Sequence, residues 1–327
     1  YTSQPLYAPD DKDGTTLLEP GQEGITVLGQ AYGQLRYRDY ALLTGYRQMV
    51  DDGYVNSQDN RMLPNTFEGV TLKGKVGFVA YNVGYLWEIK PRNSDEFISM
   101  SQQAGGTGPS EGLVLTSLTL TTWKPLNVYL GNDYVPNVFN TVFGKAEYTH
   151  QLTEEWKLQL GLQYTDQRSV GNAQIGEFST WNVGFGARLS WRGLALGTAA
   201  HFTGDDNNIQ SPYGSWPGYL SLIQTDFDHA GEKAWGVGLT YDFAGTLLPF
   251  QVPGLLARLA YARGTDLGNP STGSSRPDEW EADLDLTWNV PAVKGLQVRF
   301  RNAYWGNGGP QTGYQFRVIL NYEFDLL

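Results

Sequence analysis

Arginines recur on one side of several alternating segments of this chain. The stretch GLQVRFRNAYWG places Leu296, Val298 and Phe300 on one side of an extended backbone, and it places Arg299 and Arg301 on the other. A guanidinium group stays charged and offers two parallel donors to a carboxylate. Two neighbouring arginines therefore predict an anion-attracting surface, provided that this side of the strand faces water.

The same alternation assigns further charged residues to the polar side. The predicted basic set is Arg36, Arg38, Arg188, Arg258, Arg299, Arg301 and Arg317. The predicted acidic set is Glu281, Asp283 and Asp285. Basic groups that line a narrow pore with low-dielectric walls focus the field and raise the local concentration of anions. Alternatively, the arginines pair with the acidic set on the adjacent strand and stiffen the wall, and both roles can coexist.

The segments that carry these charges alternate with a period of two. They are about ten residues long, the length that a tilted strand needs to cross a bilayer. Aromatic residues stand at both ends of some apolar sides, as in Trp181 to Trp191 and Trp280 to Trp288, which is typical of a membrane interface. The opposite sides carry Gly, Asn, Gln, Arg and Asp, which cannot pack a core of normal density. The pattern favours a membrane barrel over a soluble sandwich.

Composition excludes several other classes of protein. The chain has 327 residues, no cysteine, 40 glycines and 44 aromatic residues, namely 20 Tyr, 14 Phe and 10 Trp. No run of about 18 apolar residues predicts a transmembrane helix. The net charge of −11 argues against a nucleic-acid partner, which would require a basic face. No motif implies a cofactor or a bound metal.

The alternating segments predict about fifteen strands joined by short turns at one end and long polar loops at the other. The expected strands are 25–38, 40–49, 66–74, 76–89, 112–123, 125–133, 139–151, 155–168, 177–191, 193–203, 232–243, 255–264, 279–290, 295–305 and 311–325. The predicted fold class is therefore all-β, a transmembrane antiparallel up-and-down β-barrel formed by one domain, 1–327.

Several segments resemble the OprD family of outer-membrane porins from Gram-negative bacteria. The similar segments are LLTGYRQMVDDGYVNSQDNRMLPNTFEGVTLKG (42–74), DFDHAGEKAWGVGLTYDF (226–243), VPGLLARLAYARGTDL (252–267), LQVRFRNAYW (296–305) and FRVILNYEFDLL (316–327). The first includes the family's Arg-[LM]-[FL]-Pro pattern as RMLP. The resemblance implies a barrel of about eighteen strands, an even number as in bacterial barrels. We therefore expect that about three N-terminal strands are absent from this sequence.

The resemblance also implies roles for particular residues. Members of the family guide carboxylate-bearing solutes with a column of basic residues, to which Arg299, Arg301 and Arg317 correspond. The chain departs from this column at Ala260 and Thr287, which puts a strong preference for carboxylates in doubt.

Two loops, 47–66 and 203–231, are expected to fold into the barrel and narrow it. Their candidate constriction residues are Asp51, Asp52, Tyr54 and Arg61 in the first loop, and Asp205, Asp206, Tyr213 and Tyr219 in the second.

We therefore expect an outer-membrane porin and not an enzyme. The porin is expected to allow passive, substrate-preferring diffusion of small polar solutes, with carboxylates or amino acids as the preferred solutes. Its expected partners are outer-membrane lipid and lipopolysaccharide, the solutes themselves, and the barrel assembly machinery, in a monomer or a loose trimer. Three alternatives stay open. An oligosaccharide porin would use Tyr213, Trp216 and Tyr219 as an aromatic slide, a rim hydrolase would use His201 with Asp205 or Asp206, and a structural barrel would be plugged by its loops.

Overall fold

A computed structural model gives the positions of residue 2 and of residues 18–21, 23–307 and 312–324. The other residues of the predicted 1–327 domain, including both ends of the predicted strand 311–325, lie outside this described part.

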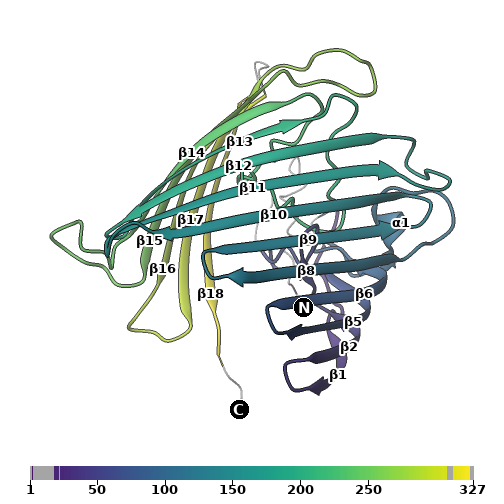
Figure 1. Cartoon of the computed structure of the whole chain (residues 1–327), viewed down its shortest axis with the longest axis horizontal. Coiled ribbons are helices and arrows are strands. Elements are labelled where there is room, and N and C mark those ends of the chain that lie inside the picture. The colour runs from purple at the N-terminus through teal and green to yellow at the C-terminus, as the bar shows by residue number, and fades with distance from the viewer. Residues whose placement is uncertain (1, 3–17, 22, 308–311, 325–327) are drawn as a thin grey trace. The chain divides into compact units, whose positions relative to one another are not determined.

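The described part of the chain is almost entirely β-structure (Figure 1). Its long strands are β1 (Ala31–Tyr37), β2 (Ala41–Gln48), β5 (Thr66–Val76), β6 (Val79–Lys90), β8 (Leu113–Trp123), β9 (Leu126–Val135), β10 (Phe139–Gln151), β11 (Trp156–Ser169), β12 (Ser179–Trp191), β13 (Leu194–Thr203), β14 (Lys233–Asp242), β15 (Leu255–Thr265), β16 (Glu279–Asn289), β17 (Leu296–Gly306) and β18 (Thr312–Tyr322). The short elements are β3 (Asp51–Asp52), β4 (Val55–Asn56), β7 (Ile98–Ser99) and the helix α1 (Met100–Gln103). No helix among the described residues is long and apolar enough to cross a membrane.

Each predicted strand overlaps one of these long strands, so the predicted strand pattern is confirmed. The largest error in a boundary is at the first strand, which begins at Ala31 and not at residue 25. Ile25 is instead buried, and its backbone N–H donates to the hydroxyl of Thr2 at 2.9 Å. The three two-residue strands were not predicted, because so short a segment has no measurable alternation.

The described residues form two compact units. Unit 1 comprises 1–144, 165–179 and 210–217, and unit 2 comprises 145–164, 180–209 and 218–327. In unit 1, the strands β1, β2, β5, β6, β8 and β9 pair antiparallel in that order. In unit 2, the strands from β12 to β18 pair antiparallel in sequence order. Strands β10 and β11 contribute residues to both units, as does β12 through its first residue, Ser179.

Each long strand has one face with exposed apolar side chains. On β18, Phe316, Val318 and Leu320 have exposed fractions of 52%, 59% and 69%. On β6, Val83 and Tyr85 are exposed in the same way. Exposing apolar side chains at every second position of a strand is unfavourable in water but favourable in lipid. We call this the apolar face and the opposite one the polar face. The apolar face contacts lipid in a membrane barrel.

Candidate functional site

The strand register of unit 2 places several predicted charged residues in one row on the polar face. Arg258 on β15 lies opposite Asp285 on β16, which lies opposite Arg301 on β17, which in turn lies opposite Arg317 on β18. Arg299 lies opposite Thr287, one step along the same face. Directly paired residues of antiparallel strands share a face and lie close together. The alternation in the sequence thus brings charges from four different segments together.

Asp285 binds two of these arginines. The Nε atom of Arg299 donates to Asp285 Oδ1 at 2.9 Å, and the Nε atom of Arg301 donates to Asp285 Oδ2 at 3.0 Å. The side chains of Asp285 and Arg301 are mostly buried, with exposed fractions of 12% and 14%. Charge-assisted hydrogen bonds of this kind fix side-chain geometry. Arg299 and Arg301 are therefore held against the strand face and partly neutralised.

Arg188 and Arg258 differ from Arg299 and Arg301 in their exposure and in their contacts. Both are exposed, and neither makes a hydrogen bond or an ion pair with another described residue. Both line the same cavity of about 540 Å³. The cavity is also lined by Glu147, Tyr219 and small residues of β12 to β15. Two guanidinium groups in one cavity are available to a negatively charged solute.

Tyr219 reaches the polar face of unit 2 because that face is rich in glycine. A Cβ atom on Gly161 would lie 2.1 Å from the Tyr219 hydroxyl oxygen, and one on Gly186 would lie 3.3 Å from its ring. The ammonium group of Lys145 lies 5.5 Å from the ring centroid, a favourable cation–π distance. Burial and the charge of Glu147 raise the pKa of Tyr219. The phenol therefore stays protonated, and its hydroxyl has no hydrogen-bond partner among the described residues.

Glu281 and Asp283 hold the segment that follows Tyr219. The backbone N–H groups of Gln224 and Thr225 donate to the two oxygens of Glu281 at 2.9 and 2.7 Å. The backbone N–H of Ile223 donates to Asp283 Oδ2 at 3.2 Å. The acidic set therefore divides into two roles: Asp285 binds arginine side chains, and the other two carboxylates bind loop backbone.

Asp52 organises the first predicted loop in unit 1. Its carboxylate accepts hydrogen bonds from Asn82 Nδ2 at 2.6 Å, from Ser117 Oγ at 2.7 Å, and from the hydroxyl of Tyr129. These partners come from the polar faces of β6, β8 and β9. Asp51, by contrast, is exposed and accepts one hydrogen bond, from the backbone N–H of Ser57. Only one of the two adjacent aspartates is therefore packed on the strands.

Tyr54, Tyr213 and Trp216 complete the loop packing in unit 1. All three are buried, with exposed fractions of 3%, 2% and 3%. The hydroxyl of Tyr54 lies 2.8 Å from Thr165 Oγ1 and accepts a hydrogen bond from Trp216 Nε1 at 3.2 Å. The hydroxyl of Tyr213 donates to the carbonyl oxygen of Met100 at 3.0 Å, and burial raises the pKa of Tyr213. The three residues lie together within unit 1, and none of these rings is exposed as a platform for a sugar.

The remaining predicted residues lie apart from these clusters. Arg36 is exposed on β1, whereas Arg38 lies in the following turn with φ of 50° and its guanidinium 5.8 Å from the Tyr37 ring centroid. Arg61 contacts the carbonyl oxygen of Asn60 at 3.3 Å.

Asp205 and Asp206 are exposed at the start of the second loop. His201 lies 2.9 Å from Asn182 Oδ1 and accepts a hydrogen bond from the Tyr219 backbone N–H at 3.1 Å. The histidine thus holds the second loop on the strands of unit 2.

Several residues of these sites were not predicted from the sequence. They are Asn82, Ser117, Tyr129, Lys145 and Glu147. Their position on the polar face follows from strand alternation, so the face could have been predicted. Which loop residue each of them meets depends on long-range packing that alternation does not encode.

Comparisons with known proteins agree with this architecture. A family model described as outer membrane porin, OprD family, matches residues 15–326. OpdK of Pseudomonas aeruginosa, solved with vanillate, has 21% sequence identity and a TM-score of 0.81, over 94% of this chain and 83% of OpdK. A BenF-like porin from Pseudomonas fluorescens Pf-5 has 18% identity and a TM-score of 0.85, over 97% of this chain and 82% of that porin.

OccK9 (OpdG) of Pseudomonas aeruginosa has 20% identity and a TM-score of 0.83, over 97% of this chain and 82% of OccK9. A search of curated proteins found no match. At these identities, the structural likeness shows a shared fold, that of porin barrels. Since the family model covers nearly the whole sequence, the chain belongs to the OprD family of outer-membrane porins.

Proposed function

We propose that this outer-membrane channel favours small carboxylates, which bind transiently to Arg188 and Arg258 in unit 2. The observation that carries the proposal is the state of these two guanidinium groups. Both are exposed, both line one cavity of about 540 Å³, and neither is bound by another described residue. A guanidinium without a carboxylate partner in the protein is ready to accept one from a solute.

The other arginines support a graded arrangement. Arg299 and Arg301 keep their positive charges near the solute path, but Asp285 holds both of them. They contribute to the field more than to direct binding. The alternative role, in which arginines pair with carboxylates of the adjacent strand and stiffen the wall, therefore applies to Arg299 and Arg301. In this proposal, Arg188 and Arg258 bind the solute. Weak and divided binding of this kind suits conduction, because a solute must also leave its site.

Two further observations favour carboxylates over oligosaccharides. The phenol of Tyr219 lines the same cavity and keeps its proton, so it adds no negative charge that would repel a carboxylate. Tyr213 and Trp216 are buried and cannot stack on a sugar without disrupting unit 1. The similar porin OpdK was solved with vanillate, an aromatic carboxylate, which agrees with this class of solute. Amino acids, which also carry a carboxylate, stay within the proposal.

The loops 47–66 and 203–231 are proposed to narrow the pore, since their residues pack on the polar strand faces within each unit. Contact with lipopolysaccharide, recognition by the barrel assembly machinery, and a monomeric or loosely trimeric state remain predictions.

Uptake of benzoate and benzamide into proteoliposomes tests the proposed preference. The two solutes have nearly the same size and differ in charge. We expect the full-length protein to pass benzoate faster than benzamide. The double variant Arg188→Gln, Arg258→Gln is expected to slow benzoate and leave benzamide unchanged. Arg263→Gln is the matched control, because Arg263 lies on the same strand as Arg258 but pairs with Asp278. Equal benzoate rates in the double variant and the unchanged protein would refute the proposal.

A further inference from the structure

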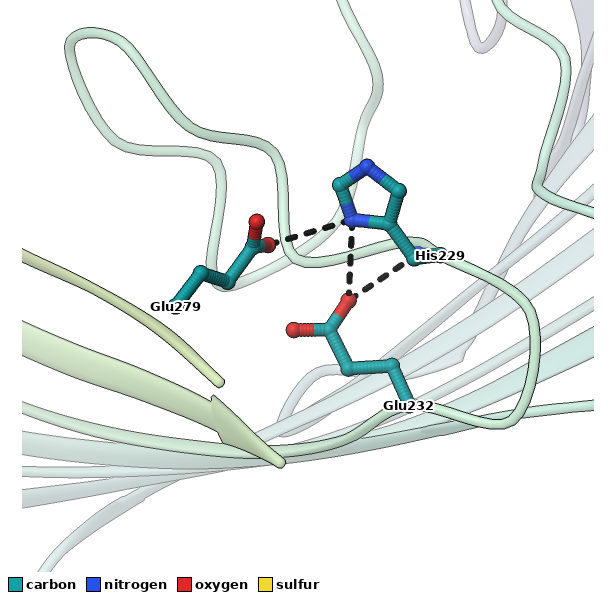
Figure 2. Close-up of side chains that lie close together, drawn as sticks. All are labelled: His229, Glu232 and Glu279. Atoms are coloured by element: carbon teal, nitrogen blue, oxygen red, sulfur yellow. Dashed lines mark hydrogen bonds and ion pairs between the residues drawn. The ribbon is translucent and has the colours of Figure 1, made fainter. Parts of the chain in front are cut away.

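His229, Glu232 and Glu279 lie close together where β14 and β16 begin (Figure 2). The Nδ1 atom of His229 is 3.1 Å from Glu279 Oε1 and 3.5 Å from Glu232 Oε2. One ligand-type atom from each residue lies within 4.8 Å of the other two. All three residues belong to unit 2, and the proposed carboxylate preference makes no use of them.

The local backbone fixes these side chains before any ligand arrives. The His229 N–H donates to Glu232 Oε2 at 2.9 Å, and the Glu232 N–H donates to the His229 carbonyl oxygen at 3.1 Å. Gly231 makes this tight turn possible with φ of +72°, a conformation that other residues rarely adopt. A Cβ atom on Gly264 would lie 1.6 Å from Glu232 Oε1. The carboxylate therefore occupies a space that exists only because residue 264 is glycine.

One atom of this cluster lacks the partner that its burial demands. The side chain of Glu232 is completely buried, and its Oε1 atom accepts no hydrogen bond from any described residue. A buried carboxylate oxygen without a donor is costly. The neighbourhood is also rich in carboxylates: burial and Asp226 raise the pKa of Asp228 well above its usual range, with further contributions from Glu232 and Glu279. A cation at this position would relieve both penalties.

We propose that His229, Glu232 and Glu279 bind a divalent transition-metal ion of the Zn²⁺ type. Zinc is commonly held by one or more histidines together with carboxylates, and bonds of about 2.0–2.1 Å in a tetrahedron place neighbouring ligand atoms about 3.3 Å apart. The two distances from His229 Nδ1, 3.1 and 3.5 Å, bracket that separation. Water completes the coordination.

Zinc titration of the folded, full-length protein in detergent, after removal of metals with a chelator, tests the proposal. We expect one Zn²⁺ per chain by elemental analysis after desalting. We also expect a saturable calorimetric heat with a stoichiometry of one Zn²⁺ per chain. Ca²⁺ and Mg²⁺ should not compete at equal concentration, since these cations prefer oxygen ligands.

Ligand variants and a control locate the site. His229→Ala and Glu279→Gln should each weaken Zn²⁺ binding by more than about 100-fold, because changes outside the coordination shell already cost about 10–100-fold. His150→Ala should leave binding unchanged, since this exposed histidine stacks on Tyr148 elsewhere in unit 2. Heat-modifiable migration in gels checks that each variant is folded. Absence of stoichiometric zinc, or equal affinity in folded Glu279→Gln, would overturn the proposal, and loss of binding in His150→Ala would assign the zinc to another site.

Discussion

The two units treat the polar face of their strands in opposite ways. In unit 1, the face carries large apolar residues such as Leu86, Leu113 and Leu115 beside polar ones, and loop residues cover it in a buried cluster. In unit 2, much of this face consists of glycine and alanine, at positions such as Gly186 and Gly238. These small residues line a cavity of about 540 Å³. The size of the strand side chains thus decides whether loops pack tightly on the face or leave room for a solute.

Charge follows the same division. In unit 1, the buried Asp52 is satisfied by three neutral donors and serves to fix a loop. In unit 2, charge is only partly compensated: Asp285 binds Arg299 and Arg301, and Arg188 and Arg258 stay without a protein partner in the described chain. A satisfied network rigidifies structure, whereas unpaired cations attract anions. Unit 1 is therefore expected to set the geometry of its loops, and unit 2 the selectivity for solutes.

The largest expected effect concerns the apolar face, which the strands of each unit have. Val318→Arg should reduce the free energy of unfolding in lipid by about 2–4 kcal/mol, because the charge would enter hydrocarbon. Ile319→Arg is the matched control at nearly the same depth, on the polar face opposite Arg299. Urea-dependent folding into vesicles measures both. A similar cost for the two variants would mean that the faces are assigned wrongly.

Breaking the loop network of unit 1 should have the next largest effect. Asp52→Ala removes the acceptor of three hydrogen bonds, and each buried donor left without a partner costs about 1–3 kcal/mol. We expect faster proteolysis within 47–66 and noisier single-channel current. Asp51→Ala, at the exposed neighbour, should change neither. If the two variants behaved alike, Asp52 would not be the residue that anchors this loop.

A charge change in unit 2 should alter selectivity with little effect on unit 1. Asp285→Asn removes the negative charge that binds Arg299 and Arg301, so the polar face gains net positive charge. We expect the reversal potential under a salt gradient to shift toward anions. Proteolysis within 47–66 should stay unchanged, and an unaltered reversal potential would show that this row of charges does not face the conducted ions.

The smallest expected effect is a pH dependence of the second loop when metal is removed. The pKa of His229 is raised from its ordinary value of 6.5 to about 10. The stabilisation from the protonated imidazole is therefore complete below pH 6.5 and is lost as the pH rises through about 10. Glu232 and Glu279 are its hydrogen-bonded partners, and Asp226 and Asp228 are nearby carboxylates. Cleavage within 218–232, with chelator present, should increase over this range, and His229→Asn should abolish the dependence.

Much of the fold could be predicted because strand alternation is a local property. The period of two identified every long strand, and it placed Arg258, Arg301 and Arg317 on a common face, as the strand register does. At Arg38, a turn with positive φ interrupts the alternation. A turn of this kind is set by the two or three residues around it, and so the strand period carries no information about it.

The contents of the candidate sites were less predictable, because they depend on loops that meet residues far away in the sequence. Asp51 and Asp52 are neighbours of the same type, yet only Asp52 meets Ser117 and Tyr129. Likewise, the spacing of His229 and Glu232 is visible in the stretch DHAGE. Glu279, however, lies 47 residues after Glu232 in the sequence and meets them only in the folded structure. Pairing across such distances follows from tertiary packing, not from local pattern.

The central claim is that unpaired Arg188 and Arg258 draw carboxylates through this porin. Single-channel recording of the full-length protein under a KCl gradient, with benzoate added to one side, tests it most directly. We predict an anion-leaning reversal potential and a benzoate-dependent reduction of current. The double variant Arg188→Gln, Arg258→Gln should shift the potential toward cations and lose the benzoate effect, while Arg263→Gln keeps both. An unchanged potential and unchanged benzoate response in the double variant would contradict the claim.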